Sequence, residues 1–107
     1  MKHSDFDKFL EEEVIAKIRN VLSSKSADYS KGDGKLYNFK LAAEMDGDTP
    51  IQSLRGMHLK HRASIRQGLD EMMMGEKPRD YKWWLEKVID DVNYDILMLA
   101  MLYSGEF

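Results

Sequence analysis

Residues 84–102 make the most hydrophobic helix available to this chain, yet polar residues recur along one side of it. The segment is rich in leucine, isoleucine, valine and methionine, so much of it must pack inward when the chain folds. Glu86, Asp90 and Asn93 stand at i, i+4 and i+7, which places them on one helix face. Carboxylates seldom lie at a core boundary without a counter-charge, a metal or a hydrogen-bond network. This polar stripe (Glu86, Asp90 and Asn93) is therefore the strongest functional clue in the sequence.

Apolar residues follow helical spacing through most of the remaining sequence, and no alternating strand pattern occurs. We expect four helices, at about residues 4–24, 36–45, 49–74 and 80–103. Their start and stop signals are Ser4 with Asp7 three residues later, Thr49 followed by Pro50, Gly75, and Asp80. A length of 107 residues suits one domain. The sequence thus predicts an all-α fold, a four-helix bundle with one short helix, as a single domain over residues 1–107.

Composition excludes several classes of function. The chain has no cysteine, so it carries neither a disulfide framework nor thiolate chemistry. A net charge of −3 argues against general binding to nucleic acid, which requires a strongly basic face. The first residues lack the apolar core of a signal peptide, and no run approaches the ~18 apolar residues of a membrane span. We expect a cytoplasmic protein with no membrane and no nucleic acid among its partners.

Two further features concern the predicted surface. Residues 25–35 are rich in glycine, serine and aspartate and predict a loop. The loop is longer than most helix–helix connections, and such loops often carry function. Trp83 and Trp84 are adjacent on one helix, so they cannot both point inward. We expect one of these rings to be exposed, packed on another subunit or free to stack on a base.

The predicted helix at 49–74 is polarised in charge. It has no acidic residue from Thr49 to Leu69, whereas its basic residues in that stretch are Arg55, Lys60, Arg62 and Arg66, with His58 and His61 between them. A basic helix beside an acidic helix suits a nucleotide site, in which carboxylates hold Mg²⁺ and the basic side chains meet phosphates. The alternative is a pair of oppositely charged helices joined by salt bridges.

The polar stripe has two interpretations of its own. Glu86 and Asp90 suit Mg²⁺, which binds proteins through one or two carboxylates plus substrate phosphates, while Asn93 holds a ligand or water. The alternative is a solvated stripe in which Glu86 pairs with Lys82 and Asp91 pairs with Lys87. A zinc site at His58 and His61 lacks an evident third nitrogen or sulfur ligand. An imidazole of His61 facing Glu86 or Asp90 is the more economical use.

Four motifs in fixed order carry a family resemblance. They are Lys25-Ser26-Ala27-Asp28-Tyr29-Ser30, Tyr37-Asn38-Phe39-Lys40, Met57-His58-Leu59-Lys60-His61, and the run from Glu86 through Asp90 to Asn93-Tyr94. Over about residues 22–103 the chain resembles small phage proteins described as MazG-like or as nucleotide-modification-associated domains. The order of the motifs carries more weight than any single one.

The resemblance implies a fold, a reaction and roles for residues. MazG-like proteins are all-α nucleoside triphosphate pyrophosphohydrolases that use Mg²⁺, assemble as dimers or tetramers, and cleave between the α- and β-phosphates. By this resemblance Glu86 and Asp90 are the catalytic, metal-holding carboxylates. The implied nucleotide-binding residues are Lys60 and His61 at the phosphates, Asp28, Tyr29 and Asn38 at the sugar or base, and Asn93.

The sequence departs from that family at one motif. The family adds an E-E-x-x-E helix, but Glu12-Glu13-Val14-Ile15-Ala16 fails at the last position. The chain is therefore expected to bind a (deoxy)nucleotide with Mg²⁺, with hydrolysis left open. The alternatives are a non-enzymatic phage effector, which binds a host protein or sequesters a nucleotide signal in the host cytoplasm, and a purely structural helical oligomer. The helix at 80–103 is apolar over too wide an arc for one small bundle, which predicts a homo-oligomer.

Overall fold

The computed structural model describes the backbone of residues 1–29 and 36–107 and the side chains of residues 1–23 and 36–107. Every regular element over these residues is helical, which confirms the predicted all-α class. The elements are α1 (His3–Phe9), the π-helical segment η1 (Leu10–Ile15), α2 (Ala16–Tyr29), α3 (Tyr37–Asp46), α4 (Pro50–Met73) and α5 (Tyr81–Ser104). α1, η1 and α2 follow one another without a break and form one rod, here called the N-terminal rod, so the structure has four helices.

Local sequence signals set most of the helix ends. Thr49 caps α4 by accepting a hydrogen bond from the backbone N–H of Gln52, whose side chain in turn accepts from the backbone N–H of Thr49. Asp80 caps α5 by accepting from the N–H of Trp83 at 2.9 Å. α3 ends where Gly47 adopts a left-handed φ of 72°, which glycine reaches without steric cost. The predicted bounds of α3, α4 and α5 are therefore confirmed to within one or two residues.

The first helix begins within one residue of its predicted start, but it lacks the predicted cap and extends beyond its predicted end. It begins at His3 without a side-chain cap, so the predicted Ser4–Asp7 capping pair is wrong. It also continues to Tyr29 instead of ending near residue 24, so part of the predicted loop is helical. Ser23 does not break the helix, because its hydroxyl donates to the backbone carbonyl of Arg19 at 2.7 Å. The rest of the predicted loop, residues 30–35, lies outside the described residues.

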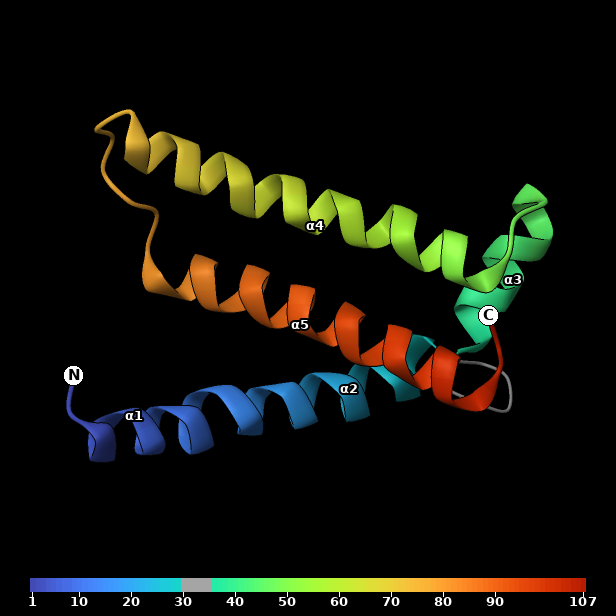
Figure 1. The fold of residues 1–107 in the computed structure, drawn as a ribbon, viewed down its shortest axis with the longest axis horizontal. Helices are drawn as coiled ribbons and strands as arrows, with labels where there is room; N and C mark the ends of the chain where they lie inside the picture. Colours follow the sequence, from blue (N-terminus) through green and yellow to red (C-terminus); the bar gives the residue numbers. More distant parts are fainter. Residues whose placement is uncertain (30–35) are drawn as a thin grey trace.

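The long helices lie in a layer with α5 in the middle. Figure 1 shows α4 along one side of α5 and the N-terminal rod along the other, while α3 crosses the end of the layer near the C-terminus. α5 packs against both α4 and α2, and α3 packs on α4. None of the helices over the described residues is long and apolar enough to cross a membrane. Any site between two of the long helices therefore includes residues of α5.

The core is small and lies at one end of the layer. The buried cluster where α3, α4 and α5 meet comprises Leu36, Phe39, Leu54 and Met101, and partly buried residues around it are Ile51, Met57, Tyr94, Leu97 and Met98. No described side chain of the N-terminal rod is fully buried. The radius of gyration is 16.1 Å, compared with about 13 Å for a compact chain of this length. The fold is therefore more extended than a closed bundle of the same size.

The other end of the α4–α5 pair is held by aromatic packing. Trp83 and Trp84 are both partly buried and meet edge to face, with ring centroids 4.9 Å apart. The guanidinium of Arg79 lies 4.3 Å from the Trp83 ring centroid. Gly68 of α4 faces both rings, and its missing side chain lets α5 approach. The prediction that the two rings cannot both point inward is therefore wrong, because Gly68 makes room for both rings against α4.

Candidate functional site

A pocket of about 270 Å³ lies between α2 and α5 and contains part of the polar stripe. Its lining residues are Lys17 and Val21 of α2 and Lys82, Leu85, Glu86, Ile89 and Asp90 of α5. Two carboxylates and two ammonium groups thus share one small concavity with three apolar side chains. A pocket with an apolar wall and a few convergent charges is the usual form of a small-molecule site.

In the part of the chain that the structure describes, the pocket lacks the ion pair between Glu86 and Lys82 that the sequence allowed. Glu86 and Lys82 stand at i and i−4, but no ion pair joins them among the described residues. Lys17 enters from the opposite wall. Sequence analysis missed Lys17 completely, and it considered Lys82 solely as a partner for Glu86. The direction in which Lys17 points depends on the rotation of α2 about its axis relative to α5. No local signal in the sequence determines this rotation.

Asp90 links the pocket to α4. Its side chain is 14% exposed, and its Oδ2 lies 3.9 Å from Nδ1 of His61. This distance is too long for a hydrogen bond, and the buried Nδ1 has no hydrogen-bond partner. Burial, with a smaller effect from the negative charge of Asp90, raises the pKa of Tyr94, whose ring packs 5.0 Å from that of His61. The geometry agrees with the expectation that His61 faces Asp90.

Asn93 extends the polar stripe into the protein interior. It is 5% exposed, and neither its Oδ1 nor its Nδ2 has a hydrogen-bond partner. Leaving a buried polar group unpaired costs about 1–3 kcal/mol, so native proteins rarely retain one without a use. Asn93 lies on the same side of α5 as Glu86, two turns further along. A bound polar molecule or an ordered water would satisfy this amide.

The remaining predicted site residues are not gathered at the pocket. Lys60 is exposed on α4 and is not among the lining residues. Asn38 is exposed on α3, which lies at the end of the layer where α5 finishes, away from its pocket-lining first half (Figure 1). Asp28 and Tyr29 belong to the last turn of α2, but their side chains lie outside the described residues.

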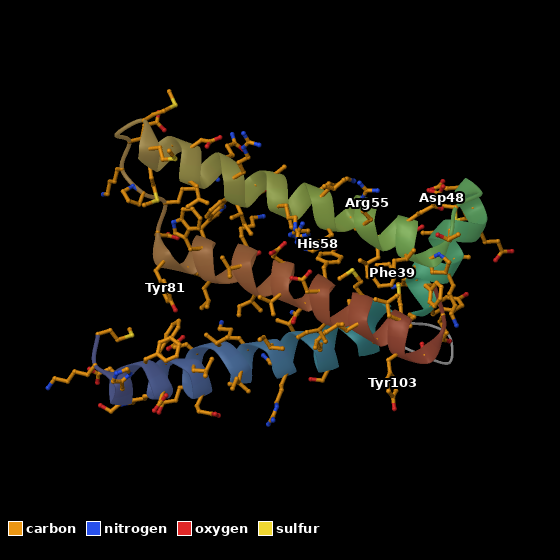
Figure 2. All side chains as sticks on the ribbon, viewed as in Figure 1. Phe39, Asp48, Arg55, His58, Tyr81 and Tyr103 are labelled. Carbon is orange, nitrogen blue, oxygen red and sulfur yellow. The ribbon has the colours of Figure 1, made fainter. Side chains whose placement is uncertain are left out.

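A second polar cluster lies on the other side of α5, toward α4 (Figure 2). Nε2 of His58 lies 2.6 Å from Oδ1 of Asp91, and Arg62 lies within 4 Å of both Asp91 and Asp95. The solvated-stripe alternative paired Asp91 with Lys87. In the structure Asp91 instead pairs across the helices with His58 and Arg62. Along this seam the oppositely charged helices are joined by ion pairs. His58, Asp91 and Asp95 are also the group within the described chain whose three ligand atoms lie close enough together to hold a metal.

Comparison with models of protein families, with curated proteins and with solved structures finds no match to this chain. The case for a function therefore depends on the residues themselves. α5 contributes to two candidate sites, namely the pocket toward α2 and the seam toward α4.

Proposed function

We propose that this protein binds a nucleotide together with Mg²⁺ in the pocket between α2 and α5. One observation carries the proposal: the pocket joins Glu86 and Asp90 to two lysines, and the buried amide of Asn93 on the same side of α5 has no partner. Carboxylates and ammonium groups that line one concavity suit a ligand that has both an anionic and a cationic part. A magnesium–phosphate complex is such a ligand.

Each polar group has a role that its chemistry supports. Glu86 and Asp90 supply the one or two carboxylates that Mg²⁺ takes when phosphate oxygens and waters complete its shell. Lys17 and Lys82 act as point charges for the phosphates. Asn93 offers one acceptor and two donor hydrogens, which match a sugar hydroxyl or the edge of a base. The unpaired Nδ1 of His61 adds a group on the α4 side.

The composition of the pocket supports binding more strongly than hydrolysis. The resemblance to MazG-like proteins implies further metal-binding carboxylates from a second helix. Here the second helix contributes Lys17 and Val21 to the pocket, and Glu11, Glu12 and Glu13 are exposed on the preceding η1 segment. Two carboxylates suffice for one Mg²⁺ but not for a pair of metal ions that would stabilise both the attacking and the leaving oxygen. We therefore propose a nucleotide-binding protein with slow turnover or none.

Calorimetric titration with nucleoside and deoxynucleoside triphosphates, with and without Mg²⁺, tests this proposal. We expect Mg²⁺-dependent binding that is weakened by Asp90→Asn and by Lys17→Gln. Matched controls are Asp70→Asn and Lys8→Gln, which change exposed residues outside the pocket. Release of pyrophosphate is measured in the same samples. If none of the nucleotides bound, the proposal would be contradicted and the alternative of a host-protein partner would remain.

We also propose that the protein acts as a homo-oligomer, a dimer or tetramer. The support is the large exposed apolar surface on the C-terminal half of α5, where Leu99 is 64% exposed and Leu102 and Tyr103 are exposed beside it. The small core and extended shape described above point the same way, since a second copy would bury what one chain leaves open.

A further inference from the structure

The seam between α4 and α5 contains a group of potential metal ligands that the proposed nucleotide pocket does not use. The atoms are Nε2 of His58, Oδ1 of Asp91 and a carboxylate oxygen of Asp95, all within 4.8 Å of one another. None of the three residues lines the pocket toward α2. Their arrangement therefore needs an explanation of its own.

We propose that His58, Asp91 and Asp95 form a second cation site, for a borderline divalent metal such as Zn²⁺, with Arg62 as a displaceable counter-ion. The ligand set is one imidazole nitrogen and two carboxylates. Nitrogen ligands favour Zn²⁺, Co²⁺ and related ions, whereas Mg²⁺ and Ca²⁺ prefer oxygen alone. Three protein ligands with a water in the fourth position is a common zinc arrangement.

The distances fit such an ion with little movement. Nε2 of His58 lies 2.6 Å from Oδ1 of Asp91 and 3.9 Å from Oδ1 of Asp95. Ligand atoms of a tetrahedral Zn²⁺ with bonds of ~2.0–2.2 Å stand ~3.3–3.6 Å apart. These two separations lie on either side of that range, so small rotations of the carboxylates bring both oxygens to such distances from Nε2, and the three ligand atoms already lie within 4.8 Å of one another. When the metal binds, Nε2 of His58 contacts the metal in place of Asp91.

The helices hold these ligands in place before any metal arrives. Asp91 and Asp95 are one turn apart on α5, so their carboxylates lie side by side. His58 is buried, and its ring stacks on Tyr94 with centroids 5.3 Å apart and planes 19° from parallel. Burial and stacking fix the imidazole so that Nε2 points at the carboxylates, as a preorganised site requires.

Arg62 is the feature that opposes a metal, and it is also the feature that can move. Its Nε lies 3.6 Å from Asp91 and its Nη2 3.9 Å from Asp95. The side chain is 59% exposed, so it can turn into solvent when a divalent ion takes its place. Pairs that are this long and exposed contribute little to stability. Arg62 thus balances the two carboxylates without closing the site.

Calorimetric titration of the metal-free protein with ZnCl₂ tests the proposal. We expect one equivalent to bind, an excess of Mg²⁺ not to displace it, and CoCl₂ to give the visible absorption of a four-coordinate ion. Asp95→Asn removes a ligand whose side chain is 44% exposed, so the fold should persist while Kd rises by at least about ten-fold. Asp70→Asn, which alters another aspartate paired with an arginine, is the matched control and should leave Kd unchanged.

Arg62→Gln separates a metal site from a simple ion-pair seam. The proposal expects this variant to bind Zn²⁺ more tightly, because the competing cation is gone. A seam without metal affinity predicts no binding by either protein, which would overturn the proposal. Equal Zn²⁺ binding by the original protein and Asp95→Asn would also overturn it, because the metal would then reside elsewhere.

Discussion

At the scale of single residues, Asn93 is unfavourable for stability but suited to the proposed ligand. Its amide is buried and unpaired in the protein alone, so folding gains nothing from it. The carboxamide has nearly the shape of a leucine side chain, and an apolar replacement would remove the unpaired atoms. The amide lies one turn beyond the pocket-lining Asp90, where the proposed ligand or an ordered water would satisfy it.

We predict that Asn93→Leu raises the free energy of unfolding by about 1–3 kcal/mol and abolishes nucleotide binding. Thermal unfolding and calorimetric titration measure the two effects separately. Asn38→Leu is the matched control, because Asn38 is exposed on α3. It should change stability by less than about 0.5 kcal/mol and leave binding intact. If Asn38→Leu weakened binding instead, the motif-based assignment of Asn38 to the nucleotide would be right and the pocket wrong.

A second residue-scale effect concerns the pair that ties α4 to the start of α5. Arg79 donates to both carboxylate oxygens of Glu71, at 2.7 Å and 3.0 Å. These hydrogen bonds hold the pKa of Glu71 below its usual 4.5, although burial acts in the opposite direction. Since the pKa of the folded state is the lower one, the stabilisation is present above pH 4.5 and is lost as the pH falls through the folded value.

We predict that Glu71→Gln lowers the unfolding free energy at pH 7 and that the difference from the original protein shrinks below pH 4.5. Chemical unfolding at a series of pH values measures this difference. Glu76→Gln, in the connection after α4, is the control and should show no such dependence. A difference that stayed constant to pH 3 would mean that the charge of Glu71 contributes nothing.

At the scale of elements, the contact of α4 with α5 depends on one glycine. A Cβ built on Gly68 would lie 2.8 Å from Cη2 of Trp84 and 3.0 Å from the ring of Trp83. Both rings are held, Trp83 by Arg79 and each by the other. Gly56, also within α4, has no atom within 4 Å of the same built position. The two glycines therefore offer a matched pair of sites on one helix.

We predict that Gly56→Ala stabilises the protein by up to about 1 kcal/mol, because alanine is the better helix former. Gly68→Ala gains the same propensity but must displace a tryptophan ring, at a cost of about 1–3 kcal/mol. It should therefore be less stable than Gly56→Ala by about that amount, as measured by urea unfolding. Equal stabilisation by the two substitutions would show that the helices can separate freely at this point.

At the scale of the whole molecule, the layered arrangement leaves α5 covered on two sides and open along its C-terminal half. Leu99, Leu102 and Tyr103 are exposed and share one side of the helix at i, i+3 and i+4. An exposed apolar face of this kind usually marks an interface. The chain is also about 3 Å larger in radius of gyration than a compact chain of its length, at 16.1 Å.

We predict that light scattering gives a mass at least twice the chain mass of 12.5 kDa at micromolar concentration. Leu99→Lys should shift the protein toward the monomer while circular dichroism stays helical. Leu59→Lys places the same charge at another exposed leucine, on α4, and should leave the assembly intact. A monomeric mass for the original protein would contradict the proposed oligomer.

Much of the secondary structure could be predicted from the sequence because its causes are local. The caps at Thr49 and Asp80 involve partners three residues away, and Gly47 ends its helix through its own φ. The helical period also placed Glu86 and Asn93 on one face of α5 before any packing was known. The C-terminal end of the first helix was mispredicted, because the hydroxyl of Ser23 bonds to the preceding turn and the helix continues past it.

The tertiary structure alone decided which side chains meet across helices. The sequence by itself determined an all-α chain whose most apolar helix carries a polar stripe. It did not reveal that Lys17 lines the same pocket as Glu86, that Asp91 pairs with His58, or that Lys60 and Asn38 lie apart from the pocket. These facts depend on the rotation and register of one helix against another. Rotation and register result from many side-chain contacts between distant segments, so no short motif encodes them.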